Sequence, residues 1–280
     1  MIEVKNLTHI YNEGTAMQSH AFENVSFTIE RGEFIGLIGH TGSGKSTMIQ
    51  HLNGLLKPTS GTVYFDGEDI FQKDYNLRKL RSKVGMVFQY PEYQLFEETV
   101  LKDVMYGPLN MQLSNDEALK RAKDALRLLG VSEDLWEHSP FELSGGQKRR
   151  VAIAGVLAMD PDVLILDEPA AGLDPGGRKD VLDTIYSLKK ERNITVILVS
   201  HSMDDVAEYA DRIMVLYKGD LKYFDTPEEV FSHVEELEEI GLSAPQITYL
   251  MYDLKKAGID VDLNANTVDE AVETILNAFK

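Results

Sequence analysis

A glycine-rich stretch at residues 39–47 constrains the fold of this 280-residue chain more than any other feature. It matches the phosphate-binding loop pattern G-x-x-x-x-G-K-[ST]. An apolar run at 34–38 predicts a buried strand before it, and the run at 48–52 predicts a helix after it. Glycines let such a loop curl so that successive N–H groups face one anion, and the helix N-terminus adds its partial positive charge. The stretch therefore predicts a strand–loop–helix unit that binds phosphate groups.

The side chains of this loop suit a nucleoside triphosphate. Lys45 can reach the β- and γ-phosphates, and the Ser46 hydroxyl can ligate Mg²⁺. All nine loop residues are candidates for nucleotide binding: Gly39, His40, Thr41, Gly42, Ser43, Gly44, Lys45, Ser46 and Thr47. Tyr11, which precedes a polar loop, is a candidate for stacking on an adenine ring, with an ordinary loop tyrosine as the alternative.

Polar residues follow the ends of further apolar strands. Apolar runs predict three more buried strands, at 84–88, 163–166 and 195–199. The residues at their ends are Gln89, Asp167 with Glu168, and His201. Apolar strands separated by helices predict an α/β fold with a parallel sheet covered on both faces. Because parallel strands end at one edge of the sheet, these residues and the phosphate loop are expected to form one site.

The chemistry of these side chains suggests their roles. Asp167 suits a ligand of the Mg²⁺ that bridges the β- and γ-phosphates, and Gln89 can contact that ion or the attacking water. Glu168 can act as the general base toward the water. His201 can hydrogen-bond the γ-phosphate. A strand end that merely reaches water is the alternative for each residue taken alone.

The remaining segments predict three additions to this core. Alternating residues within 1–30 and 62–65 predict a small antiparallel sheet, and residues from about 98 to 160 predict a helical insertion. From residue 226 the chain is rich in glutamate, and two amphipathic helices predict a small C-terminal domain over 226–280. The residues of the two apolar faces are Ile247, Leu250, Met251 and Leu254, and Val268, Ala271, Val272, Ile275, Leu276 and Phe279. An acidic appendage packed on the core is the alternative.

Charge and composition exclude several classes of protein. The net charge is −18, which argues against a nucleic-acid partner because Lys and Arg carry such binding. The chain has no cysteine, so disulfides and thiolate metal sites are excluded. We find neither a signal-peptide pattern at the N-terminus nor an apolar run long enough to cross a bilayer. Work at a membrane would therefore require a partner.

A second glycine-containing motif decides between the remaining classes. Its residues are Leu143, Ser144, Gly145, Gly146 and Gln147, and a basic helix follows them. A hydroxyl and glycine amides at a helix N-terminus form a second anion site, although a serine cap with two turn glycines is the plain alternative. One chain then has two phosphate-binding surfaces but one phosphate loop. A head-to-tail pair of such subunits would close each nucleotide between one loop and the partner's serine.

These motifs, in this order over residues 1–225, resemble the ATP-binding-cassette (ABC) family. In that family Tyr11 corresponds to the aromatic loop, residues 39–47 to Walker A, Gln89 to the Q-loop and residues 143–147 to the signature. Residues 163–168 correspond to Walker B, Asp174 to the D-loop and His201 to the switch. The resemblance implies a P-loop NTPase (RecA-like) core that hydrolyses ATP with Mg²⁺ at a dimer interface and drives a membrane partner.

Within the family the chain resembles ATPases of energy-coupling-factor (ECF) transporters, and most of all the second of their paired ATPases. The phosphate loop, residues 90–96, residues 168–172 and the short C-terminal extension carry this likeness. It implies a peripheral subunit on the cytoplasmic face of the membrane, with a second ATPase, a transmembrane coupling subunit and a substrate-binding membrane subunit as partners. The cargo would be a vitamin or other micronutrient. Whether the second ATPase is a homologous chain or another copy stays open.

The loop after Gln89 is a candidate for docking the membrane partner. It is unusually apolar and aromatic, with Tyr90, Pro91, Tyr93, Leu95 and Phe96. An exposed apolar patch in a loop usually marks an interaction site, so part of this cluster is expected to line a groove for a helix. Burial of the rings against the helical insertion is the alternative.

Other nucleotide-binding classes fit less well. A small-molecule kinase or GTPase needs no signature motif and no His201. DNA-repair members of the ABC family carry a long coiled coil, and no sustained heptads are present here. Translation members carry two cassettes in one chain, and exporters carry their own membrane helices.

Overall fold

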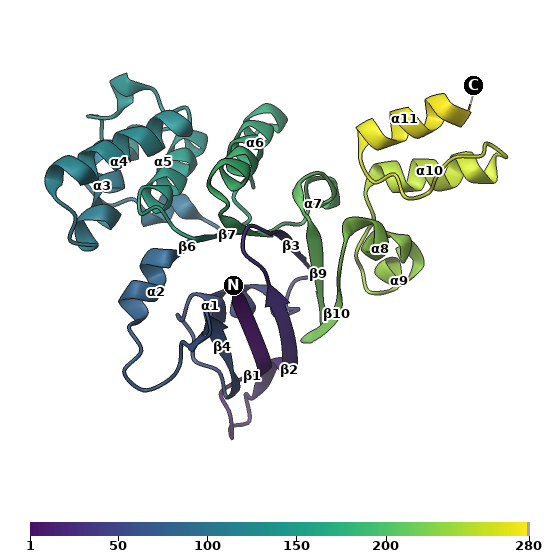
Figure 1. The fold of residues 1–280 in the computed structure, drawn as a ribbon, viewed down its shortest axis with the longest axis horizontal. Helices are drawn as coiled ribbons and strands as arrows, with labels where there is room; N and C mark the ends of the chain where they lie inside the picture. Colours follow the sequence, from purple (N-terminus) through teal and green to yellow (C-terminus); the bar gives the residue numbers. More distant parts are fainter. Residues whose placement is uncertain (279–280) are drawn as a thin grey trace.

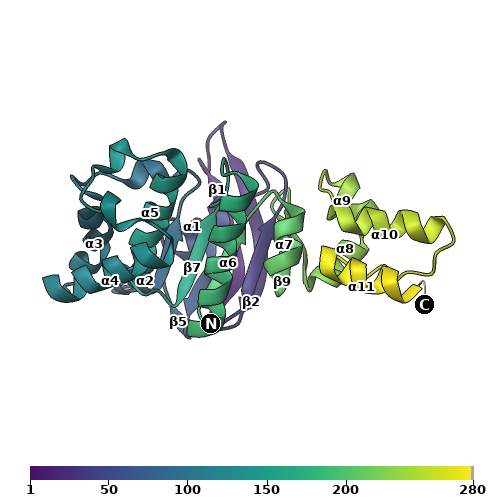
Figure 2. The same cartoon turned by 90° about the horizontal axis from the view of Figure 1, so that it is seen from above.

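The computed structural model describes residues 1–278, which form two sheets flanked by helices (Figure 1). A six-stranded sheet lies at the centre, and a four-stranded antiparallel sheet lies beside it. The helical insertion and the C-terminal helices lie at opposite ends of the longest axis, as Figure 2 shows from above. The predicted α/β core and antiparallel subdomain are confirmed.

The central sheet has the strand order β10-β9-β3-β8-β7-β6. Its strands are β3 (Phe34–Ile38), β6 (Val84–Val87), β7 (Val163–Asp167), β8 (Thr195–Val199), β9 (Arg212–Tyr217) and β10 (Asp220–Asp225). All neighbours pair in parallel except β9 and β10, which form an antiparallel edge. The sequence patterns predicted the four buried strands but not β9 and β10.

Both faces of the central sheet are buried, which explains why its strands read as continuous apolar runs. Along β7, Leu164 and Leu166 join the core under the helical insertion and the helix α6 (Pro175–Arg192). The alternate residues Val163 and Ile165 join a second core, shared with the antiparallel sheet and α1 (Lys45–Leu52). Side chains of one strand point alternately to opposite faces, so β7 connects the two cores.

The antiparallel sheet has the order β2-β1-β4-β5. Its strands are β1 (Ile2–Tyr11), β2 (Ser19–Ile29), β4 (Ser60–Phe65) and β5 (Glu68–Asp69). A short turn with Asp66 and Gly67 at positive φ joins β4 to β5. Tyr11 is the last residue of β1, whereas the sequence placed it in a loop. The strand continues that far because residues 9–11 still pair with β2 after a register shift.

The helical insertion lies between β6 and β7. Its helices are α3 (Val100–Asn110), α4 (Asn115–Leu128) and α5 (Gly145–Leu157), and α2 (Leu77–Lys83) precedes β6. Ser114 caps α4 by accepting a hydrogen bond from the N–H of Glu117, and Gly130 at positive φ follows the helix end. The buried side chains of the insertion form one core with a face of the central sheet and with α6.

The C-terminal segment consists of two parts. The helices α8 (Pro227–Ser232) and α9 (Val234–Glu239) share a buried cluster with β9 and with α7 (Met203–Tyr209). The helices α10 (Gln246–Lys256) and α11 (Val268–Ala278) form a separate small cluster around Met251 and Ala271. The capping box at the start of α11 is present, because Thr267 and Glu270 exchange side-chain to backbone hydrogen bonds.

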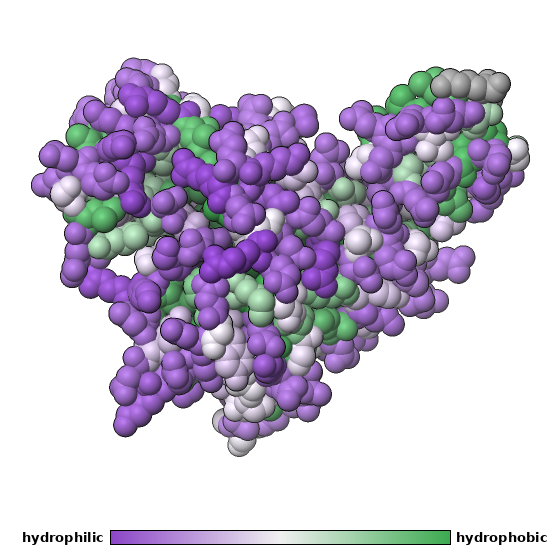
Figure 3. Space-filling model, in the orientation of Figure 1, coloured by the Kyte–Doolittle hydropathy of each residue, from purple (hydrophilic) through white to green (hydrophobic). Residues whose placement is uncertain are grey.

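The apolar faces of α10 and α11 are only partly covered. Met251 and Ala271 are buried, but Leu250, Val268, Val272 and Leu276 are exposed. Phe279, which the sequence placed on the same face, lies outside the described residues. Figure 3 shows apolar surface gathered on these helices and on the helical insertion. Among residues 1–278, no helix combines the length and the apolar character needed to cross a membrane.

Candidate nucleotide-binding site

The phosphate loop connects β3 to α1 at the carboxyl end of the central sheet. Gly44, the last residue before α1, has φ of 105°, and an added Cβ would lie 2.7 Å from the carbonyl oxygen of Ala21. A larger residue would therefore clash with β2 as well as strain the backbone. Ser43 is fully buried, and its Oγ has no hydrogen-bond partner within the described residues. Glycine is therefore required at position 44, where the loop packs closely against β2.

Lys45 is buried under the loop that it follows. Its Nζ donates hydrogen bonds to the carbonyl oxygens of Gly39 at 2.6 Å and His40 at 3.0 Å. Burial lowers the pKa of Lys45, and the charges of Glu168 and Asp167 oppose that effect. An ammonium has three N–H donors, so one remains for a phosphate oxygen after the two carbonyl bonds.

Asp167 and Ser46 form a pair of oxygen donors beside this lysine. Asp167 is the last residue of β7 and is buried. Burial, with the neighbouring charge of Glu168, raises the pKa of Asp167 to about 6, whereas Lys45, His201 and a hydrogen bond with Ser46 oppose the rise. A carboxylate and a hydroxyl are the hard oxygen ligands that Mg²⁺ prefers. The residues present therefore fit the predicted magnesium site.

Glu168 and His201 face each other across neighbouring strands. The Nε2 atom of His201 lies 2.7 Å from Oε1 of Glu168. Glu168 has φ of 51°, in the left-handed region that non-glycine residues rarely adopt. Its N–H donates to the carbonyl oxygen of Val199 at 3.0 Å, and its carbonyl accepts from the N–H of Ala171 at 3.2 Å. Strained backbone of this kind persists where surrounding contacts hold it, and it is common at functional sites.

Gln89 lies two residues beyond the end of β6, the strand next to β7. Its side chain is exposed at the same edge of the sheet as Asp167. Tyr11 lies on the other side of the phosphate loop, where its hydroxyl is 2.9 Å from Oγ1 of Thr47. The tertiary structure thus brings the predicted residues of one chain to one edge, with Tyr11 joined directly to the loop.

The signature residues lie at the start of α5. Ser144 caps the helix: its Oγ accepts from the N–H of Gln147 at 3.3 Å, and its own N–H donates to the Gln147 side chain at 2.9 Å. Leu143 is buried in the core of the insertion, and Gly145 has open space where a side chain would lie. Asp174 caps α6 in the same way, by accepting from the N–H of Gly177 at 2.6 Å. Both caps expose the N-terminus of a helix at the surface.

The apolar segment after Gln89 is only partly exposed. Tyr90, Tyr93 and Phe96 are exposed, whereas Pro91 and Leu95 are buried. The sequence predicted that part of the cluster lines a groove, and the exposure of the cluster is limited because Pro91 and Leu95 are buried. Leu95 belongs to the core of the insertion because a short 3₁₀ helix (Pro91–Gln94) turns the segment back against α5.

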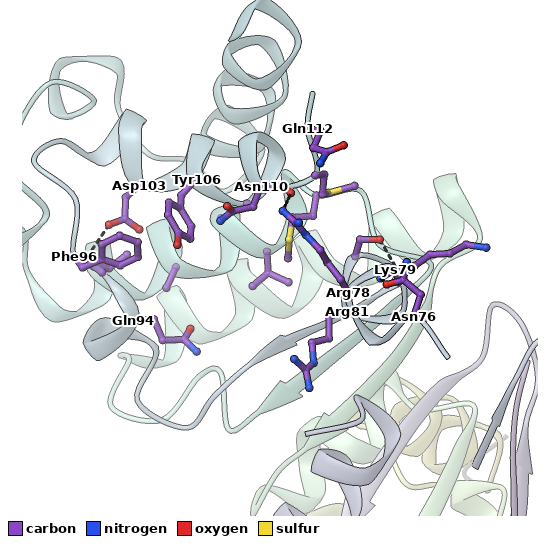
Figure 4. A pocket seen from close by; sticks show the side chains of 18 residues that line it. Asn76, Arg78, Lys79, Arg81, Gln94, Phe96, Asp103, Tyr106, Asn110 and Gln112 are labelled. Atoms are coloured by element: carbon purple, nitrogen blue, oxygen red, sulfur yellow. Dashed lines mark hydrogen bonds between the residues drawn. The ribbon is translucent and has the colours of Figure 1, made fainter. Parts of the chain in front are cut away.

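A groove of about 630 Å³ lies beside this segment (Figure 4). Leu95 and Phe96 line it together with residues of α2, α3 and α5. Phe96 packs edge-to-face on Tyr106 at 4.8 Å between ring centroids, while Arg78 and Arg81 lie at the other end. Asp103 accepts hydrogen bonds from the N–H groups of Phe96 and Glu97, at 2.8 and 2.9 Å, and thereby holds the backbone at this end of the groove.

Two features of the site were not identified from the sequence. Arg149 belongs to the basic helix that follows the signature motif, but its side chain is buried and forms an ion pair with Glu92 in the apolar segment at 3.4 Å. This pair joins the segment after Gln89 to the signature helix. His9 of β1 and His51 of α1 are both buried, and their rings contact each other beside Tyr11. The burial of His9 has a signal in the sequence, because it continues the inward-facing positions of β1.

Comparisons with known proteins identify the group. A family model described as ABC transporter matches residues 22–171. The energy-coupling factor transporter ATP-binding protein EcfA2 of Clostridium tetani is 54% identical over 279 residues, 99% of this chain and 97% of that protein. Among solved structures, cbiO1 of Clostridium perfringens, part of the ABC transporter complex cbiONQ, is 42% identical over 90% of this chain and 98% of its own, with a TM-score of 0.75.

A dimeric structure of the ATP-binding cassette MJ0796, bound to ADP and Pi, is 33% identical over 81% of this chain and 98% of its own, with a TM-score of 0.74. The resemblance that the motifs indicated is thus confirmed in sequence and in fold. This chain belongs to the ABC transporter family of ATPases, within the group of the energy-coupling factor transporter ATP-binding proteins.

Proposed function

We propose that this chain powers an ECF-type importer by hydrolysing ATP, and that the cargo is a vitamin or other micronutrient. The observation that carries the chemistry is the contact of His201 with Glu168 beside Lys45 and Asp167. It joins a candidate base to a candidate phosphate-binding site at one edge of the sheet. The similarity to ECF ATPases over the full length supports the transport role.

The roles of the residues follow from their geometry. Lys45, held by two loop carbonyls, directs its third N–H to a phosphate oxygen. Ser46 and Asp167 would hold Mg²⁺, and a bound Mg²⁺ would offset the negative charge on the β- and γ-phosphates. His201 orients one oxygen of Glu168, which leaves the other oxygen to accept a proton from water. Gln89, exposed at the same edge, contacts the ion or the water.

One partner of this chain is a second ATPase of the same family, either a homologous chain or another copy of this one. The cap formed by Ser144 leaves the amides of Gly145 and Gly146 at an exposed helix N-terminus. Such a terminus attracts the γ-phosphate of a nucleotide bound to the other subunit. Asp174 lies at the exposed start of α6 and belongs to the same interface. The dimeric cassette that is 33% identical supports this arrangement.

The membrane partner docks beside the segment after Gln89. An apolar floor with Leu95 and Phe96, and arginines at one end, suits a helix with an apolar face and an acidic or carbonyl-rich end. Tyr90 and Tyr93 extend the exposed aromatic surface beyond the groove, and Pro91 between them is buried. The chain would thus lie peripherally on the cytoplasmic face of the membrane, bound to a transmembrane coupling subunit that in turn holds a substrate-binding subunit.

Residues 226–280 serve as a dimerisation unit in this proposal, and residues 1–225 as the nucleotide-binding domain. The exposed stripe of Val268, Val272 and Leu276, spaced one helical turn apart, supports an apolar contact there. The test of the whole proposal is mass spectrometry of the complex that co-purifies with this chain from detergent-extracted membranes. We expect two membrane proteins, together with either a homologous ATPase or further copies of this chain, and a chain recovered without membrane partners would contradict the proposal.

A further inference from the structure

We propose that His9 and His51 are positioning residues that hold the ring of Tyr11, as a platform for the nucleotide base, in a fixed relation to the phosphate loop. The inference rests on the proposed function as an ATPase and on the expectation from the sequence that Tyr11 stacks on adenine. It goes further by assigning a role to two buried histidines that hydrolysis does not use. It concerns base affinity and not turnover.

Four residues form a closed ring of contacts. The Tyr11 hydroxyl lies 2.9 Å from Oγ1 of Thr47, the last residue of the phosphate loop. The carbonyl oxygen of the same threonine lies 2.7 Å from Nδ1 of His51, one turn further along α1. Nε2 of His51 lies 3.2 Å from Nδ1 of His9, and the ring of His9 packs edge-on against Tyr11 at 4.4 Å between centroids.

The ring connects two elements that come from different parts of the chain. Tyr11 and His9 belong to β1, whereas Thr47 and His51 belong to α1. The helix carries Lys45 and Ser46 at its first turn, so anything fixed to Thr47 is fixed relative to the phosphates. Tyr11 is fixed twice, through its hydroxyl and through its ring edge.

The hydrogen bonds in this ring have one consistent arrangement of protons. Burial lowers the pKa of both imidazoles, that of His51 to about 4, so both are neutral near pH 7. A neutral imidazole carries one proton, and Nδ1 of His51 must donate it because it faces a carbonyl oxygen. Nε2 of His51 then accepts the proton of Nδ1 on His9. Turning either ring would break one of these bonds.

Aromatic neighbours hold the two imidazoles from the sides. Phe22 of β2 lies edge-on to His51 at 5.3 Å and tilted against His9 at 6.3 Å. Phe71 lies 6.5 Å from His51. His51 is completely buried and His9 is 8% exposed, whereas Tyr11 remains 39% exposed. Rigid support beneath one exposed ring is the arrangement expected of a preorganised stacking surface.

Preorganisation affects affinity through conformational entropy. A side chain that must be ordered on binding costs affinity, and the reported cost per side chain corresponds to roughly two- to tenfold in the dissociation constant. Removing the ring of His9 frees the edge of Tyr11 but leaves the phosphate loop, Lys45 and Ser46 in place. We therefore expect weaker binding of ATP without weaker binding of the phosphates themselves.

The experiment compares ATP with inorganic tripolyphosphate, which lacks the base. Dissociation constants for both ligands are measured by calorimetry on the full chain and on three variants: Tyr11→Ala, His9→Ala and the double variant. We expect each single variant to bind ATP more weakly, with a dissociation constant that rises by roughly two- to tenfold in His9→Ala. The dissociation constant for tripolyphosphate should not change. We also expect His9→Ala to add no further loss in the Tyr11→Ala background, since it acts through that ring.

Two further variants keep the result interpretable. His20→Ala removes an exposed histidine of the neighbouring strand and should leave both ligands unchanged. His9→Phe keeps a ring beside Tyr11 but loses the bond to His51, so it protects against a failure of His9→Ala to fold. We expect His9→Phe to bind ATP more weakly than the native chain does, and native affinity would overturn the role of His51.

The two possible failures are distinguishable. If Tyr11→Ala leaves ATP binding unchanged, the expected stacking of Tyr11 on adenine is wrong, and this inference is wrong with it, whereas the proposed ATPase function is not affected. If Tyr11→Ala weakens ATP binding but His9→Ala does not, only the inference is wrong. If His9→Ala weakens the binding of ATP and of tripolyphosphate equally, the histidines stabilise the loop as a whole and do not position the ring of Tyr11.

Discussion

His201 holds the carboxylate of Glu168 at 2.7 Å, although the two residues are 33 positions apart in the chain and come from neighbouring strands. The pair joins the end of β7 to the end of β8, and the left-handed backbone at Glu168 turns its side chain toward the histidine. A base held in this way keeps one orientation while a water approaches. The first prediction concerns this carboxylate.

Replacing Glu168 by Gln should abolish most turnover and leave nucleotide binding intact. The amide keeps the size of the side chain and loses the basic oxygen, so we expect turnover to fall by roughly 10²–10⁴, the usual contribution of general-base catalysis. Phosphate release and ATP binding are measured on the same preparation, with Glu191→Gln on the outer surface of α6 as a matched control. Native turnover in the Glu168 variant would rule out this base.

A mixture of two inactive variants should recover activity if each site is shared between two subunits. Lys45→Ala loses one charge-assisted contact, and we expect ATP to bind roughly 10- to 150-fold more weakly. Ser144→Arg should bind ATP but not hydrolyse it, because the substitution blocks the opposite site. In a mixed dimer one site has a native Lys45 facing a native Ser144. If no mixing ratio restores phosphate release, sharing between subunits is contradicted.

Charges on the exposed aromatic segment should prevent assembly with the membrane partner. Tyr93 is 84% exposed and Phe96 is 55% exposed, so the double change to Asp should leave the isolated chain folded with its basal ATPase activity. We expect loss of the co-purified membrane subunits and of transport. Leu95 is unsuitable for this test, because at 6% exposure a charge there would disrupt the core. Met17→Asp, at an 81% exposed position, is the control.

Removing the last two helices should weaken dimerisation without damaging the nucleotide site. A truncation after residue 244 leaves α8 and α9 in their buried cluster, whereas one after 225 would remove Val230 and Phe231 and expose the residues of α7 and β9 that pack against them. For the chain truncated after residue 244, we expect a higher dimer dissociation constant in sedimentation-equilibrium experiments without nucleotide. We expect its affinity for ATP to be unchanged. Val272→Lys on the exposed stripe of α11 should have the same effect in the full chain. Equal dimer dissociation constants for the native chain, the truncated chain and Val272→Lys would show that the dimer contact does not involve α10 and α11.

Acid should destabilise the chain partly through His51. Burial lowers the pKa of this imidazole from 6.5 to about 4, so the folded chain binds fewer protons than the unfolded chain between these values. Its contribution to stability is present at pH 7 and is lost as the pH falls through this window. Between pH 7 and 5 the free energy of unfolding should fall by about 2 kcal/mol less in His51→Gln than in the native chain. Urea titrations at both pH values measure this difference, and identical pH dependence would contradict the assignment.

The sequence by itself determined the parts of this protein that depend on local chemistry. The phosphate loop, the signature turn and the four apolar strands are recognisable because their spacing alone specifies backbone conformation and burial. The caps at Ser144 and Thr267 are local for the same reason, since each hydrogen bond spans three residues. The grouping of Gln89, Asp167 and His201 followed from one rule, that parallel strands end at one edge.

Tertiary structure alone decided which side chains meet and which are covered. The sequence shows Arg149 only as one of the basic residues that open a helix, and packing of the insertion buries it against Glu92. Leu95 and Phe96 are adjacent and both apolar. Leu95 is buried because the segment packs against α5, whereas Phe96 is exposed. The contact of His9 with His51 joins residues 42 positions apart. Such contacts depend on the packing of whole elements. A local pattern can show that His9 faces inward, but it does not show which residue of another element it meets.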